Sequence, residues 1–419
     1  MTWKVAKKEI VSNLLSYKFF IVILLTAILI FTSFFIMHRD YKHRLADYQL
    51  IKPKPTEPIA VIPPNPLSIF SKGLEEFITR SFEISVVQIA ARSGMKSGNL
   101  LFSYFPVPDF LYIVRVVLSL VALLFGFDQV SREKERGTLK LMLSNSLSRA
   151  KTLIGKWIGN FLCLSIPFLL ITLLGVVFLN LDPDSGFSSG HIVRLAIIVI
   201  LSLIYIAFFL SLGILISTLT RRAAASIVIL LFIWAILVFI IPNLGTLLAR
   251  QMVDVPSVKA LSEKRQQTWT REVLLGEEDR RKGESSWEAH YKAIYSDMDK
   301  KEENYRNKFN SLVRLSKNIN RISPVASFVY AVTEIAGTGV GEESRLKSAV
   351  VNYKNSIFSQ IISTRMGKAG KEYPTFAYRY RPLSQIFSEG ALFDMVWLIF
   401  FNILFFALSY FAFVKYDVR

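Results

Sequence analysis

Six long apolar runs constrain this chain more than any other feature of its sequence. They lie at residues 18–37, 110–130, 156–179, 192–219, 224–248 and 393–414. A run of about 20 apolar residues crosses the hydrocarbon core of a bilayer as a helix, because every backbone polar group must be hydrogen-bonded within the segment there. The sequence therefore predicts an all-α polytopic membrane protein with six transmembrane helices.

Lysine and arginine gather on one side of these spans. Basic residues crowd the N-terminus, the segment 131–155, the turn at 221–222 and the tail 415–419, whereas the short loop after span three has Asp182 and Asp184 as its only charges. Short loops rich in lysine and arginine remain in the cytoplasm. We therefore expect a multi-pass protein of the cytoplasmic (inner) membrane with both termini in the cytoplasm.

The N-terminal residues 1–17 have the pattern of an amphipathic helix. Its apolar face holds Trp3, Ala6, Ile10 and Leu14, and the lysines Lys4, Lys7 and Lys8 lie off that face. Such a helix lies flat in the membrane interface, with its lysines toward anionic headgroups. We expect Trp3 and the three lysines to be membrane-interface residues.

Two segments, 38–109 and 250–391, are expected on the opposite, extracytoplasmic side of the membrane. The first is rich in proline between residues 53 and 66 and should be extended there. Residues 67–94, which follow, have the apolar spacing of a helix. The larger second segment is predicted to form an inserted, mainly helical extracytoplasmic domain.

The inserted domain contains the pattern of a long helical hairpin. Apolar residues recur every seven positions from Tyr291 to Ile319, which predicts one amphipathic helix over about 285–321. Residues 256–275 also have a helical pattern, and residues 276–283 would supply the turn. If straight, the longer arm would reach roughly 50 Å at about 1.5 Å per residue. The hairpin would either dock an extracytoplasmic protein or cap the membrane bundle.

Several function classes are disfavoured by what the sequence lacks. No carboxylate or histidine lies near the middle of a span, where ion-coupled transporters carry one, so a secondary transporter is the least favoured alternative. The four histidines are scattered, Cys163 stands alone, and no nucleotide-binding lysine loop or hydrolase motif is present. The net charge of +18 is spread over membrane flanks and outer loops, which suits anionic lipids better than nucleic acid. We expect no catalytic residue, metal or cofactor on this chain and no nucleic-acid partner.

The segment between spans two and three carries the most informative pattern. After Asp128, a charged turn leads into a short amphipathic helix with Leu139, Met142 and Leu143 on one face, and a polar break then precedes the helix of span three. A short amphipathic helix of this kind lies in the inner interface or fills a groove in a cytoplasmic partner. An ordinary basic loop is the alternative.

This stretch resembles the signature of ABC-2 type exporter permeases. The resemblance is carried by Glu135-Arg136-Gly137-Thr138, a leucine-rich helix over 139–143, the pair Ser148-Arg149, and the pair Gly155-Lys156 at the start of span three. The chain departs from the family at Ser146, where a proline is usual. The resemblance extends to the six-span layout and the N-terminal helix, and the large insertion is similar to the subset with extended extracytoplasmic domains.

The resemblance implies a coupling site for a separate ATPase subunit. The residues it assigns to ATPase coupling are Glu133, Glu135, Arg136, Gly137, Thr138, Leu139, Met142, Leu143 and Arg149. ATP and magnesium would bind the partner ATPase, and a second permease copy or a paralogue would complete the complex. The expected function is ATP-driven export. The alternative is a mechanotransmission complex, in which the hairpin acts on an extracytoplasmic protein and nothing crosses the membrane.

Overall fold

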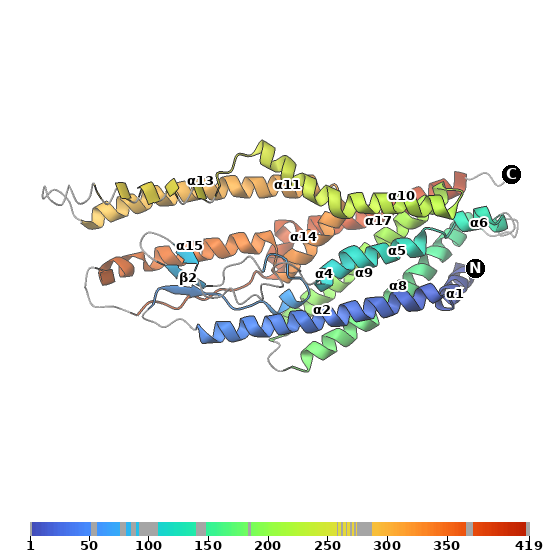
Figure 1. Cartoon of the computed structure of the whole chain (residues 1–419), viewed down its shortest axis with the longest axis horizontal. Helices are drawn as coiled ribbons and strands as arrows, with labels where there is room; N and C mark the ends of the chain where they lie inside the picture. Colours follow the sequence, from blue (N-terminus) through green and yellow to red (C-terminus); the bar gives the residue numbers. More distant parts are fainter. Residues whose placement is uncertain are drawn as a thin grey trace.

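The protein is an elongated helical bundle with both ends of the chain at one end of the molecule (Figure 1). We name that end the terminal end and the opposite one the distal end. The computed structural model describes the chain except residues 1, 52–56, 76–80, 85–88, 92–107, 140–147, 183–185, 258, 261–262, 265, 269, 272–273, 275–286, 366–371 and 416–419.

Within these described residues, six helical segments are long and apolar enough to cross a membrane. They are α2 (Tyr17–Leu50); α4 (Phe110–Tyr112) with η2 (Ile113–Leu118), α5 (Ser119–Gly126) and α6 (Ser131–Glu135); α8 (Arg149–Asn180); α9 (Ser189–Leu219); α10 (Ala223–Ala235) with η4 (Ile236–Ile240) and α11 (Ile241–Met252); and α16 (Leu383–Ile386) with η5 (Phe387–Ala391) and α17 (Leu392–Lys415). The predicted all-α polytopic fold with six spans is confirmed. The remaining described helices are α1 (Thr2–Leu14), η1 (Pro66–Ile69), α13 (Trp287–Asn320), α14 (Pro324–Ala336) and α15 (Val340–Arg365).

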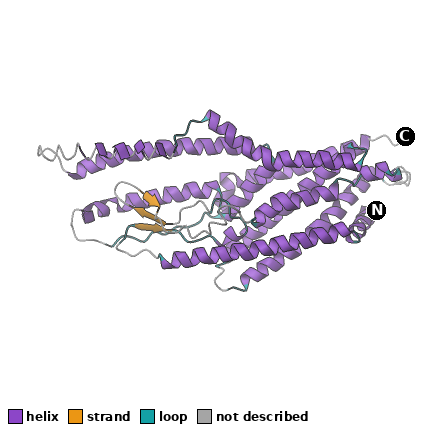
Figure 2. Ribbon diagram, in the orientation of Figure 1, coloured by secondary structure: helices purple, strands orange, loops and turns teal. Residues whose placement is uncertain are grey.

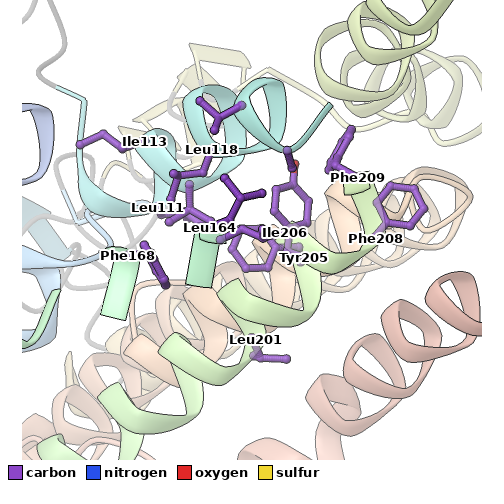
Figure 3. Packing of buried hydrophobic residues seen from close by; sticks show 14 of the residues in the cluster. Leu111, Ile113, Leu118, Leu164, Phe168, Leu201, Tyr205, Ile206, Phe208 and Phe209 are labelled. Carbon is purple, nitrogen blue, oxygen red and sulfur yellow. The ribbon is translucent and has the colours of Figure 1, made fainter. Parts of the chain in front are cut away.

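Helix α9 is the centre of the membrane bundle. No side chain between Leu201 and Thr218 is exposed, and Tyr205 and Phe209 lie at the centre of this packing (Figure 3). Where α5 crosses α9, a Cβ on Gly126 would lie 2.9 Å from the Cα of Gly213, so the two backbones meet directly. Small residues allow such close crossings in membranes, where helices gain little from hydrophobic burial alone.

The expectation of a helix over residues 67–94 is wrong. Among the residues of this range that the structure describes, only the short η1 is helical. Three strands, β1 (Ile59–Val61), β2 (Ser81–Ile84) and β3 (Ile89–Ala91), form an antiparallel sheet in the order β1-β2-β3 at the distal end (Figure 2). Gly73 turns the chain with a φ of 50°, and the amide of Leu74 then donates to the carbonyl of Thr338 at 2.9 Å. The sheet packs on α15 through Ala60 and Ile84. These long-range contacts override the local helical spacing.

The predicted long hairpin is present, and a non-helical stretch at 253–257 separates its first arm from α11 at the end of the fifth span. The hydroxyls of Thr246 on α11 and Ser316 on α13 lie 3.2 Å apart, and Lys301 Nζ donates to Thr268 Oγ1 at 3.4 Å. These pairings run in opposite directions along the two arms, so the arms are antiparallel. The 34 residues of α13 correspond to about 51 Å of helix. The expected turn at 276–283 lies outside the described residues.

A buried arginine joins the distal domain to the spans. The guanidinium of Arg381, 3% exposed, donates to carboxylates of Glu334, Glu342 and Glu389 at 2.7, 2.6 and 2.5 Å. Its backbone carbonyl accepts from Arg194 at the distal start of α9. One residue thus ties α14, α15 and η5 to the fourth span.

A second ion pair links the hairpin base to the sixth span. The guanidinium of Arg321, immediately after α13, donates two hydrogen bonds to the carboxylate of Asp394 in α17, at 2.6 and 3.0 Å. The backbone carbonyl of Arg321 accepts from the indole of Trp397 at 2.7 Å. Ser323, which caps α14, also donates to the carbonyl of Leu237 in the fifth span at 3.1 Å. The hairpin is therefore fixed to two spans at its base.

Candidate functional site

The candidate site is the elbow at the terminal end, where the second span ends and α6 begins. The amides of Val130 and Ser131 both donate to the hydroxyl of Ser217 at 3.0 Å. Lys134 Nζ adds hydrogen bonds to the carbonyls of Thr218 and Thr220. Since these acceptors lie at the end of α9, the elbow is fastened to the fourth span by both backbone and side chain.

The far side of the elbow is fastened to the fifth span. Glu135 Oε2 accepts from the amide of Ala223, the first residue of α10, at 3.3 Å. A carboxylate is favourable there because the first amides of a helix lack partners within it and carry partial positive charge. Arg136 and Gly137 then form an exposed turn, in which the φ of 72° at Gly137 is one that L side chains rarely adopt.

The structure corrects one detail of the expected elbow. The charged run before the turn is itself helical, since α6 spans Ser131–Glu135, and the turn comes after it at Arg136 and Gly137. Helical structure resumes at Thr138 and Leu139. Leu139 is only 2% exposed. The predicted coupling residues Met142 and Leu143 lie outside the described residues. Arg149, by contrast, begins α8 and donates to the carbonyl of Val414 at the end of the sixth span.

A buried charge cluster connects the elbow to the third span and to the N-terminal helix. Lys156 Nζ, on α8, lies 2.7 Å from Glu133 Oε1 and 3.2 Å from Glu9 Oε1. Lys156 is only 2% exposed and Glu9 9% exposed. A buried ammonium requires compensating charge, and the two carboxylates supply it. We call Glu9, Lys156 and Glu133 the inner triad.

Two glycines bring α1 close enough to form the triad. A Cβ on Gly155 would lie 2.8 Å from the carbonyl of Thr2, and a Cβ on Gly159 would lie 2.8 Å from that of Ala6. The spacing Gly-x-x-x-Gly places both on one face of α8 and allows two helix backbones to touch. Asn13 strengthens the contact by donating to Asn160 at 2.8 Å.

We expect Gly159→Leu to push α1 away from α8. The side chain has no free space, and overpacking of this kind costs about 1–3 kcal/mol. Trypsin should then cut after Lys7 and Lys8 faster than in the unmodified protein, as measured by the mass of the released peptides. Gly190→Leu is the matched control, because only one side-chain atom, at 3.8 Å, lies near a Cβ at that position. Equal cleavage in the two variants would contradict the role assigned to Gly159.

The sequence pattern located the elbow but missed most of what holds it. Trp3 is 63% exposed and Lys4, Lys7 and Lys8 are exposed, while Ala6 and Glu9 form the face of α1 that packs on α8. Glu9 was absent from the predicted site. Its signal was available, because it is the only acidic residue among the first 37, in an otherwise basic N-terminal region. The Gly155 to Gly159 spacing was a second such signal.

Comparisons with known proteins identify the family of this chain. A family model described as ABC-2 family transporter protein matches residues 3–418. Two relatives named "Probable ABC transporter permease protein NosY", from Stutzerimonas stutzeri and Pseudomonas aeruginosa, are 33% and 32% identical over 95 residues. That stretch covers 22% of this chain and 34% of each relative, so the chain matches only about a third of their length. Because the family model covers nearly all of the sequence, the chain belongs to the ABC-2 family of transporter proteins.

Proposed function

We propose that this chain is the permease subunit of an ABC-2 type complex that exports a substrate with energy from a separate ATPase. The terminal end faces the cytoplasm and receives the ATPase at the elbow, and the distal domain lies outside the cytoplasmic membrane. A second copy of the chain, or a paralogue, completes the membrane part. The concentration of lysine and arginine in the short loops at the terminal end supports this orientation. The relatives named as ABC transporter permeases support the role.

The observation that carries the proposal is the way the elbow is built into the bundle. It extends directly from the second span, is hydrogen-bonded to the ends of the fourth and fifth spans through Ser217 and Ala223, and is ion-paired to the third span through Lys156. A push on the elbow is therefore shared among four spans, as a rigid-body transition requires.

The described contacts divide the predicted coupling residues into two groups. Glu133 and Glu135 are engaged inside the chain, with Lys156 and with the amide of Ala223, and so position the elbow. Arg136 is exposed at the tip of the turn and is the charge that the ATPase would contact. Gly137 permits the turn that presents it.

Replacing Arg136 tests the docking role. We expect Arg136→Gln to weaken co-purification of the ATPase by roughly tenfold, since a charge-assisted hydrogen bond contributes about 1.5–3 kcal/mol. Membrane insertion and thermal stability should not change, because the side chain is exposed. Arg222→Gln is the matched control, an exposed arginine in the neighbouring turn. Undiminished association in the Arg136 variant would remove the elbow from the docking site.

The attachment of the hairpin to the spans favours mechanotransmission as the alternative function of the same ATP-driven complex. At the base of the hairpin, Arg321 is ion-paired to the sixth span and Ser323 is hydrogen-bonded to the fifth span. A motion of these two spans would therefore also move the hairpin. In a mechanotransmission complex that motion would act on an extracytoplasmic protein without transport. Shortening the hairpin between α11 and α13 separates the two functions. An exporter should keep ATP turnover and flux, whereas a force-transmitting complex should keep turnover and lose its extracytoplasmic effect.

A further inference from the structure

A polar cavity of about 610 Å³ lies beside the elbow at the terminal end. Its wall is shared by α1, the start of α2, the end of the second span, α6, the turn after α6 with Arg136 and Thr138, and Lys156 of α8. Leu124 and Phe125 provide an apolar part of the lining, while the rest is polar or charged. The cavity is therefore amphipathic, with its polar groups at the level where the spans end.

Two buried acceptor atoms in this lining lack hydrogen-bond partners among the described residues. They are Gln129 Oε1 and Glu133 Oε2. Gln129 is only 9% exposed, and its Nε2 is committed to the carbonyl of Phe125 at 2.9 Å and to Asn160 at 3.3 Å. Buried acceptors left unpaired are costly, and such atoms are normally satisfied by a partner. These two unpaired acceptors therefore favour a ligand that donates hydrogen bonds.

The lining has an excess of positive charge, which favours an anionic group on the same ligand. Basic side chains outnumber acidic ones five to three. Lys156 is paired within the inner triad, and Asp128 is paired closely with Arg132 at 2.5 Å. Lys18 lies 3.8 Å from Asp128 with its side chain 59% exposed, so it remains available to a ligand. Lys8 lies on the exposed side of α1 at the cavity. The surplus of cations fits one phosphate.

The position of the cavity selects the source of that phosphate. Its wall includes Ser16, which caps α2, and Lys18 in the first turn of that span. Beside it, Leu14 at the end of α1 and Leu15 just after it are exposed. Surfaces of this kind meet headgroups and the first carbons of acyl chains. A ligand held here can keep its chains in the bilayer while its headgroup enters the polar wall.

We propose that the cavity binds the headgroup of a phospholipid that carries a hydrogen-bond donor beyond its phosphate, such as an ethanolamine or a glycerol headgroup. The phosphate lies against Lys8 and Lys18. The donor satisfies Gln129 and Glu133. A choline headgroup has the same phosphate but no N–H or O–H donor, so this site discriminates against it. Arg136 belongs both to this lining and to the proposed ATPase contact, but lipid binding itself requires only that the spans are embedded in a membrane.

Lipid retention by the purified full chain tests the proposal. The protein is exchanged into detergent with equal amounts of phosphatidylethanolamine, phosphatidylglycerol and phosphatidylcholine, and bound lipids are counted by native mass spectrometry. We expect the ethanolamine and glycerol lipids to be retained about tenfold more than the choline lipid, since each hydrogen bond contributes about 1 kcal/mol. Gln129→Met should reduce that preference, and Lys18→Gln should reduce retention of all three. Lys4→Gln, on the same face of the membrane but outside the cavity, is the matched control.

Each other outcome overturns the proposal. Equal retention of the three lipids, or a preference that survives Gln129→Met, would exclude recognition by these acceptors. Competition by soluble glycerophosphoethanolamine as strong as by the lipid would show a site for a soluble phosphoester. If Gln129→Met weakened ATPase association while lipid retention stayed the same, the cavity would belong to the docking joint. The lipid readouts leave the proposed export function untouched, because that function is tested separately by ATPase association of the Arg136→Gln variant.

Discussion

Replacing Lys156 by methionine should destabilise the terminal end of the protein more than any other single change there. The variant leaves Glu9 and Glu133 without the cation that lies 3.2 and 2.7 Å from them. Breaking a buried ion pair by removing one partner costs about 3–5 kcal/mol, because the remaining charge stays buried. We expect a lower midpoint of thermal unfolding in detergent and rapid tryptic cleavage of α1, since the triad joins α1 to α8.

The controls separate the charge from the helix. Lys151→Met changes an exposed lysine on the same helix and should leave the midpoint and the cleavage rate unchanged. Combining Lys156→Met with Glu9→Gln and Glu133→Gln should recover most of the loss, because replacing all members of a buried ionic group removes the unpaired charges. A triple variant no more stable than the single one would show that Lys156 acts through packing. Similar behaviour of the Lys151 and Lys156 variants would refute the triad.

The features that sequence predicted are those encoded locally. The spans follow from apolar length and α13 from its seven-residue period. The helix expected after the polar break is α8, which Ser148 caps by accepting from the amide of Lys151 at 3.3 Å. Each of these signals lies within a short stretch of sequence, so it does not depend on contacts with distant segments of the chain.

The features that sequence missed depend on contacts between distant segments. Glu9 and Lys156 are separated by 147 positions, and neither residue alone indicates that the other is its partner. The expected helix over residues 67–94 was wrong for the same reason. Short apolar segments fit a helix or a strand equally well, and the pairing of Phe82 with Ala91 and the packing on α15 decide between them. Nonlocal pairing, and not weak propensity, limited the prediction.

The distal domain should respond to the loss of Arg381 as strongly as the terminal end does to the loss of Lys156. Arg381→Met removes the guanidinium that Glu334 and Glu342 share, and both carboxylates are less than a tenth exposed. The expected loss is about 3–5 kcal/mol in the free energy of unfolding of this domain, by the same penalty for a buried unpaired charge. Limited proteolysis and thermal unfolding in detergent measure it. Arg379→Met, two residues earlier and exposed, should behave like the unmodified protein.

The pH dependence of this loss identifies its cause. Burial alone would raise the pKa of Glu334, but Lys317 and Arg381 together hold that pKa below its ordinary value. The stabilisation is therefore present above the ordinary pKa and is lost as the pH falls through the lowered one. Without Arg381 the pKa of Glu334 should rise, although Lys317 still lies 3.0 Å from it, and protonation then removes a buried charge that has lost one of its two cations. The difference between the variant and the unmodified protein should thus be large at neutral pH and shrink near about pH 4, where free glutamate titrates. A difference that stays constant over this range would assign the effect to lost packing of the arginine side chain instead of to its charge.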